Sequence, residues 1–160
     1  RAVIEWSWAP LSEPERELVM WLAVFPAGAT LDAVDDLELL TGLVDKSLVE
    51  RGGERYRMLE TIRSYALERL AESGREEAIR GRQAQYLLRL AESAEAELRS
   101  AAQLDALARL DVERDNIAAA LRFAVDTDAV DLGIRLIAAV FLYWTLRGFH
   151  SERVDRLRGG

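Results

Sequence analysis

From Glu76 to the end of the chain the sequence contains no proline, and its apolar residues recur at the spacing of an α-helix. No alternation of apolar and polar residues interrupts this pattern, so no strand is predicted there. Antiparallel helices joined by short turns are typical of a bundle or of a helical repeat array. Polar breaks divide the pattern into predicted helices at 76–98, 102–111, 113–126 and 129–148, with a frayed end from Ser151.

The first half of the chain has a different order of elements. Ser12 and Pro14 are typical of a helix start, and they predict a helix over 13–25. A short helix is expected from Thr30 to Val34, and a longer one from Leu37 to Leu48. Alternating residues on both sides of Gly52-Gly53 then predict a β-hairpin over 48–51 and 55–58. The helical pattern resumes at Leu59 and ends at Gly74.

These elements define a mainly α fold class. Residues 1–74 are predicted to form a winged-helix domain, with three helices plus a β-hairpin wing, and residues 75–160 an antiparallel helical array. A length of 160 residues fits one domain or two small ones. We expect the helical region to continue beyond the printed sequence, and a further segment to precede the tryptophans Trp6 and Trp8.

Few residues are suited to catalysis or to metal binding. The chain has no cysteine, and its single histidine, His150, excludes a site with two histidine ligands. No glycine-rich phosphate loop is present. The acidic pairs Asp35-Asp36 and Glu76-Glu77 stand where helices are expected to start, which is a structural role. We therefore expect no enzyme, and no catalytic, cofactor-binding or metal site in these residues.

The charge and hydropathy of the chain narrow the classes of partner. The formal net charge is −7, which is the wrong sign for a chain that wraps nucleic acid. No apolar run reaches the roughly 18–20 residues that span a bilayer. The absence of cysteine fits a reducing compartment. We expect a cytoplasmic location and no membrane partner.

Two segments of the first half carry a family resemblance. They are Leu40-Thr41-Gly42-Leu43-Val44-Asp45-Lys46-Ser47-Leu48-Val49 and Arg55-Tyr56-Arg57-Met58-Leu59-Glu60-Thr61-Ile62-Arg63-Ser64-Tyr65-Ala66. The sequence resembles the winged-helix region of bacterial signal-transduction (STAND-type) P-loop ATPases, many of which are LuxR-type or AfsR-like transcriptional regulators. The resemblance extends to Ile4-Glu5-Trp6-Ser7, Leu11-Ser12, Val112-Glu113-Arg114-Asp115-Asn116-Ile117, Ala120-Leu121 and Leu146-Arg147-Gly148.

The resemblance implies a function for the chain. In that family a nucleotide-binding module precedes the winged helix, and tetratricopeptide-like (TPR-like) repeats follow it. This segment would then be a non-catalytic coupling element, with ATP or ADP bound elsewhere in the parent protein. Its expected partners are the missing nucleotide-binding module of the same chain and an inducer or protein on the repeats.

The sequence departs from the family pattern at two places. It is shorter than usual between Thr30 and Leu39, so a loop is either deleted or absent from the chain. Related nucleotide switches have a Met-His-Asp motif where this chain has Met58-Leu59-Glu60, and leucine cannot donate a hydrogen bond to phosphate. Nucleotide sensing would then fall to Arg57 or Arg63.

A winged helix raises the question of DNA binding. The third helix, which enters the major groove in DNA-binding examples, carries Glu38 and Asp45 against Lys46. Phosphates would repel such a helix. The wing and the helix after it are basic, and we interpret this cluster as a surface that contacts a partner, with DNA binding through the wing arginines as the alternative. The candidate interaction residues are Arg51, Arg55, Arg57 and Arg63.

Aromatic residues are concentrated at the start of the chain and in the predicted helix 129–148. Trp6 and Trp8 are expected to pack on the first helix or on the missing ATPase module. Phe141, Tyr143 and Trp144 are interpreted as core, with a ligand groove as the alternative.

Overall fold

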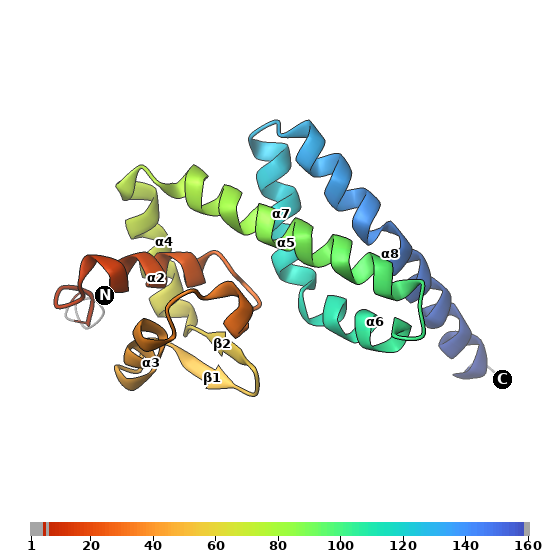
Figure 1. The fold of residues 1–160 in the computed structure, drawn as a ribbon, viewed down its shortest axis with the longest axis horizontal. Helices are drawn as coiled ribbons and strands as arrows, with labels where there is room; N and C mark the ends of the chain where they lie inside the picture. Colours follow the sequence, from red (N-terminus) through yellow and green to blue (C-terminus); the bar gives the residue numbers. More distant parts are fainter. Residues whose placement is uncertain (1–4, 6, 159–160) are drawn as a thin grey trace. The chain divides into compact units, whose positions relative to one another are not determined.

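The computed structural model describes residue 5 and residues 7–158, apart from the side chains of residues 149–155. The fold is mainly helical, with one two-stranded antiparallel sheet among the described residues, which confirms the predicted fold class (Figure 1). The chain divides into two compact units, Arg1–Gln83 and Ala84–Gly160. The long helix α5 (Glu76–Leu98) contributes its beginning to unit 1 and its remainder to unit 2.

Unit 1 contains the predicted order of helices and hairpin. The helix α2 packs against α4 and α3. The second predicted helix is a single 3-10 turn, η1, because Val34 already has extended backbone angles. The elements are α2 (Glu13–Ala23), η1 (Leu31–Ala33), α3 (Leu37–Asp45), β1 (Glu50–Gly52), β2 (Arg55–Arg57) and α4 (Glu60–Ser73).

The start of α2 is fixed by a capping box. The backbone N–H of Glu15 donates to Ser12 Oγ at 3.3 Å, and the backbone N–H of Ser12 donates to Glu15 Oε1 at 3.0 Å. From Leu18 to Ala23 the helix is buried without interruption. It ends two residues earlier than predicted, because the chain tightens there and the N–H of Phe25 bonds to the carbonyl of Leu22 at 3.1 Å.

The wing is joined to the loop that follows α2. In the hairpin Arg51 stands opposite Tyr56. Tyr56 also exchanges two backbone hydrogen bonds with Ala29, at 3.0 and 2.8 Å. Gly28, at φ +74°, lies so close to the wing that an added Cβ would be 2.6 Å from Arg57 Cγ and 2.7 Å from the carbonyl oxygen of Tyr56. The loop after α2 is therefore held against the second strand.

Unit 2 is an all-helical layer. It consists of the rest of α5 with α6 (Gln103–Val112), α7 (Arg114–Asp126) and α8 (Val130–Arg158), and α7 and α8 lie side by side (Figure 1). Ion pairs on its surface join Arg135 to Glu92 at 2.6 Å and Arg109 to Glu97 at 3.5 Å. Fully buried side chains from all four helices form its core; they include Leu87, Leu88, Ala91, Leu107, Leu110, Ala120, Leu136 and Val140.

Helix boundaries in the second half agree with the sequence except at the end. The limits of α5 are those predicted, and α6 and α7 begin one residue late. The predicted end of the last helix at Gly148 is wrong, since α8 continues to Arg158. A single glycine costs a helix only about 1 kcal/mol relative to alanine and keeps its N–H in the hydrogen-bond ladder, so it need not end the helix.

Candidate functional site

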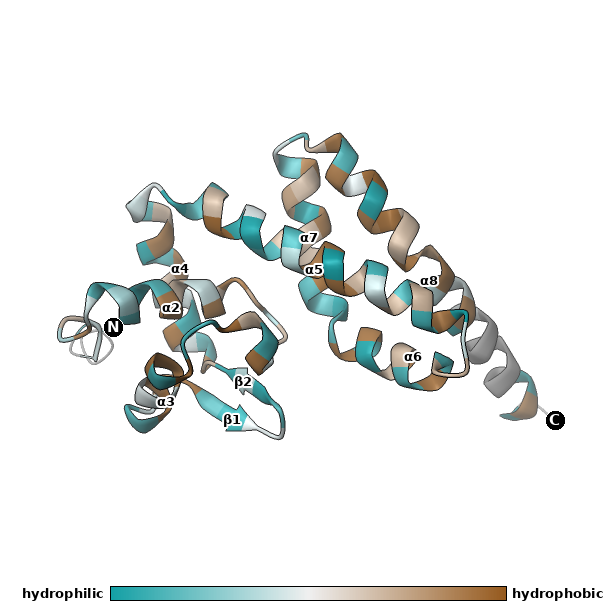
Figure 2. Ribbon diagram, viewed as in Figure 1, coloured by the Kyte–Doolittle hydropathy of each residue, from teal (hydrophilic) through white to brown (hydrophobic). Residues whose placement is uncertain are grey.

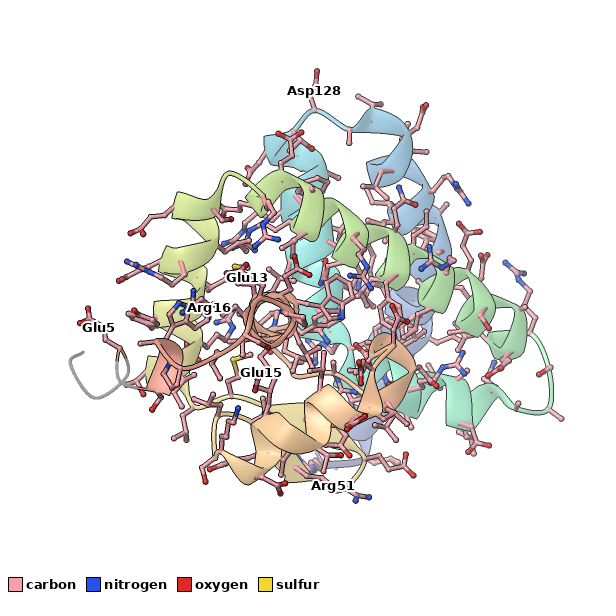
Figure 3. All side chains as sticks on the ribbon, turned by 60° about the vertical axis from the view of Figure 1, so that its left-hand side comes forward. Glu5, Glu13, Glu15, Arg16, Arg51 and Asp128 are labelled. Carbon is pink, nitrogen blue, oxygen red and sulfur yellow. The ribbon has the colours of Figure 1, made fainter. Side chains whose placement is uncertain are left out.

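Two of the four candidate interaction arginines are exposed on the wing. Arg51 lies on β1 and Arg57 on β2. The Nε of Arg51 donates to the carbonyl of Gly53 at 3.0 Å, across the hairpin turn. Its side chain projects away from the ribbon (Figure 3). These two guanidinium groups are the part of the predicted surface that a partner can reach.

The other two candidate arginines are turned inward to backbone carbonyls. Arg55 donates from Nε to Ala27 at 3.1 Å and from Nη2 to Gly28 at 2.9 Å. Arg63 donates from Nε to the carbonyl of Ala23, the last residue of α2, at 2.8 Å. Carbonyls at the end of a helix lack intrahelical partners and carry partial negative charge, so cations stabilise them. Arg55 and Arg63 therefore hold the end of α2 and the loop after it.

The outer face of α3 carries negative charge. Glu38 and Asp45 are exposed on it. The neighbouring Lys46 forms an ion pair with Glu15 of α2. The hydrogen bond from Lys46, together with the backbone N–H of Ser12, lowers the pKa of Glu15 to about 2. Because Lys46 is paired in this way, α3 presents mainly carboxylates to an approaching partner.

One member of each acidic pair has the structural role at a helix start that the sequence predicts. Asp36 accepts a hydrogen bond from the N–H of Leu39 at 3.0 Å and caps α3. Glu76 pairs with Arg80 at 3.0 Å within the first turns of α5. In the part of the chain that the structure describes, no group of three or more histidine, cysteine or acidic residues could hold a metal ion.

A contact of Trp21 was missed by the sequence reasoning. The indole Nε1 of Trp21 donates to the carbonyl of Ala33 at 2.7 Å. The guanidinium carbon of Arg82 lies 4.3 Å from the centroid of the Trp21 ring, and Nη2 of Arg82 is 3.2 Å from Asp35. These contacts join the beginning of α5 to α2 and η1 within unit 1. No sequence spacing indicates them, because the residues belong to separate elements.

A second unpredicted cluster lies in unit 2. Asp111 accepts a hydrogen bond from the hydroxyl of Tyr143 at 2.6 Å and two from Arg147, of which the one from Nε measures 2.9 Å. Burial raises the pKa of Asp111, but the donors outweigh it and the pKa lies below its usual value. Burial and the hydrogen bond to Asp111 raise the pKa of Tyr143 to about 12. The cluster joins α8 to the end of α6.

The aromatic residues of α8 divide between the core and the surface. Tyr143 is buried, as interpreted from the sequence, but Phe141 and Trp144 are exposed and the prediction that they belong to the core is wrong. Phe141 is 64% exposed and Trp144 is 46% exposed. Trp144 lines a groove of about 240 Å³ between α7 and α8, together with Ala118, Leu121 and Val140.

Trp8 packs partly as expected on the first helix. Its ring lies edge-on to Tyr65 of α4, with centroids 5.9 Å apart, and 5.5 Å from the guanidinium of Arg16 on α2. Trp6 and the side chain of His150 lie outside the described residues. Among the helices that the structure describes, none combines the length and the apolar character needed to cross a membrane.

Comparison with known proteins finds relatives in mycobacteria. The chain is 36% identical over 171 residues to the Mycobacterium tuberculosis protein named "Putative HTH-type transcriptional regulator Rv0890c", and equally similar to its Mycobacterium bovis counterpart Mb0914c. These matches cover 95% of this chain and 19% of each relative, so the chain spans about a fifth of their length.

A third relative has no function in its name. The Mycobacterium tuberculosis protein named "Uncharacterized protein Rv0894" is 40% identical over 103 residues, which cover 54% of this chain and 26% of that protein. No family model and no solved structure matches the chain. The similarity is therefore to particular proteins of much greater length.

Proposed function

We propose that this chain is a non-catalytic regulatory and interaction segment of a bacterial transcriptional regulator. The names of two mycobacterial relatives, which describe HTH-type transcriptional regulators, support the proposal. The roles of the charged side chains in unit 1 support it as well. In this role the chain acts in the cytoplasm, where the bacterial chromosome lies.

The orientation of the basic side chains is the observation that carries the proposal. Arg55 and Arg63 donate to backbone carbonyls at the end of α2 and in the loop after it, and so they stabilise unit 1 itself. The exposed face of α3 is acidic. A DNA-reading helix at this position would instead present basic or polar groups to the bases and phosphates. Unit 1 is better suited to contact a protein surface.

The finer form of the proposal is that unit 1 couples a nucleotide-binding module to sensor repeats. The family resemblance supports it: an ADP-bound module would hold the winged helix, and ATP exchange with inducer on the TPR-like repeats of unit 2 would release it. Such a switch requires a difference of a few kcal/mol between two interface states and no catalytic group. Arg51 and Arg57, the exposed members of the arginine set, are the proposed contacts to the module.

Charge reversal on the wing tests this coupling in the full-length protein. Arg51→Glu together with Arg57→Glu is expected to speed the release of a fluorescent ADP analogue and to raise basal transcription, because the resting interface loses two cations. Arg122→Glu, at an exposed position of α7, is the matched control. Release and basal transcription that both equal those of the wild type would refute the assignment of the wing as the contact.

DNA binding through the wing is the alternative. Its supporting observation is that Arg51 and Arg57 are exposed on the hairpin, where a wing can reach the phosphate backbone. This alternative predicts binding to duplex DNA that weakens steeply with added salt. It also predicts that Arg51→Glu with Arg57→Glu abolishes this binding. The coupling proposal predicts instead that the wild type does not bind duplex DNA.

A further inference from the structure

The first two turns of α5 belong to unit 1 and are attached to it by long side chains. Arg75, the residue before the helix, forms an ion pair with Glu17 of α2 at 2.6 Å. Arg82, at the end of the second turn, lies 3.2 Å from Asp35 and stacks on the ring of Trp21. These contacts attach both ends of the segment to α2 and to the residues after η1.

Both ion pairs are exposed to solvent. The side chains of Arg82 and Asp35 are 57% and 90% exposed, and those of Arg75 and Glu17 are 42% and 57% exposed. Exposed ion pairs contribute little, because water solvates the separated charges nearly as well and screens their attraction. The stacking of Arg82 on the buried indole of Trp21 is therefore the stronger attachment.

The same two turns contribute nothing fully buried to the core. None of residues 76–82, a stretch that the structure describes in full, is buried. Burial begins abruptly with Gln83 and Ala84, which are 2% and 0% exposed. In Figure 2 teal predominates in the first turns of α5, with a brown band between. Helices in proteins gain most of their stability from packing an apolar face, so these turns lack the support that the rest of α5 has.

A glycine lies next to this boundary. Gly81 comes directly before Arg82 and two residues before the first buried position of α5. Glycine weakens a helix relative to alanine, because its backbone loses more conformational freedom on folding. The helix is therefore weak at the point where its exposed part meets its buried part. Segments with few buried contacts are the ones that open locally while the rest of a protein stays folded.

We propose that the first two turns of α5, residues 76–82, form a latch that opens by local unwinding and that Arg82 closes by covering Trp21. In the open state α2, α4 and the part of α5 from Gln83 onward stay folded. Opening uncovers the indole face and frees the guanidinium together, and tryptophan and arginine are enriched among the residues that dominate protein interfaces. A partner that binds this pair would favour the open state. The inference concerns unit 1 alone and does not rest on the function proposed above.

Hydrogen exchange of the 160-residue chain, measured by NMR at single amides, tests the local opening. The helical amides of residues 80–82 should exchange at least about tenfold faster than those of Leu87 and Leu88, after correction for intrinsic rates. Ala78→Gly, at an exposed position in the latch, should speed their exchange about fivefold. Ala96→Gly makes the same change at an exposed position beyond the latch and should not affect them. Equal acceleration by the two variants would overturn the proposal, because α5 would then open as one unit.

The closing role of Arg82 is tested with the same amides. Arg82→Ala should speed their exchange roughly two- to fivefold, because the stacking on the indole is lost. Arg89→Ala, which removes an exposed arginine from a later turn of α5, is the matched control and should leave the exchange unchanged. An exchange rate in Arg82→Ala that equals the rate in Arg89→Ala would show that the stacking does not close the latch.

Oxidation of Trp21 by hydroxyl radicals, measured by mass spectrometry, reports whether opening uncovers the ring. Ala78→Gly alters no contact of the indole, so any increase in oxidation must come from more frequent opening. We expect such an increase in Ala78→Gly and none in Ala96→Gly. Oxidation of Trp21 that is the same in the wild type and both variants would contradict the latch, because the unwound turns would then leave the ring covered.

Discussion

Arg82 lies over the ring of Trp21, with its guanidinium carbon 4.3 Å from the ring centroid, and it reaches Asp35 at the same time. Trp21 is 5% exposed and is hydrogen-bonded to the carbonyl of Ala33. The arginine thus covers a buried indole at the point where α5 begins. This stacking links the start of the long helix to the helical part of unit 1.

Replacing Arg82 separates the stacking from the ion pair. Arg82→Ala should lower the free energy of unfolding by about 1 kcal/mol, mainly through lost contact with the Trp21 ring. Asp35→Asn removes only an exposed ion pair and should change the free energy of unfolding by less than about 0.5 kcal/mol. Urea denaturation followed by circular dichroism measures both variants. A larger loss in Asp35→Asn than in Arg82→Ala would show that the ion pair dominates.

Arg63 is predicted to stabilise the fold through its bond to the end of α2. Arg63→Met keeps much of the side-chain volume but leaves the carbonyl of Ala23 without this donor, which should cost about 1–3 kcal/mol in the free energy of unfolding. Arg51→Met, in which only an exposed turn contact is lost, is the matched variant and should stay within about 0.5 kcal/mol of the wild type. Equal effects of the two substitutions would refute the inward role of Arg63.

We predict that Gly28, which lies against the wing, cannot be replaced by a larger residue without a loss of stability. Gly28→Ala adds a Cβ at positive φ and within 2.7 Å of the carbonyl oxygen of Tyr56, so the loop or the wing must shift. Gly53→Ala also places a Cβ at positive φ, but in open space, and it reports the backbone strain alone. Gly28→Ala should lower the melting temperature more than Gly53→Ala. Similar melting temperatures would mean that the close approach costs nothing.

Glu15 should make stability depend on acid pH. Its pKa is lowered from 4.5 to about 2 in the folded chain, so it contributes stability above pH 4.5 that is lost as the pH falls towards 2. The stability difference between the wild type and Glu15→Gln should therefore shrink across this range. Glu13→Gln, which lies outside the capping box, is the control. A difference that is the same at pH 2.5 and pH 6 would contradict the pairing with Lys46.

Local signals in the sequence predicted most element boundaries. Gly74 predicts the end of α4, and in the structure it adopts the left-handed conformation, φ +76°, that commonly ends a helix. Ser12 and Pro14 predict the start of α2, and in the structure Ser12 and Glu15 form a capping box there. Gly148 is also a glycine, but its backbone is not left-handed and α8 continues through it. The predicted helix end there is wrong because glycine permits a helix to end but does not require it.

The roles of the basic residues could not be predicted from the sequence. Arg63 and its acceptor Ala23 are 40 residues apart, and Arg55 and Ala27 are 28 apart. Their acceptors are backbone carbonyls, which every residue carries, so composition and spacing give no sign of them. The exposure of Phe141 and Trp144 was missed for a related reason. An apolar pattern shows which side of a helix avoids water, but not whether a neighbour covers the other side.

The most direct test of the account is the anisotropy of a labelled DNA duplex titrated with the chain at low and at moderate salt. We predict no saturable binding at either salt concentration, because the outer face of α3 is acidic and two of the four arginines serve unit 1 internally. Tight binding at low salt that collapses with added salt would contradict this and would make the wing a DNA contact.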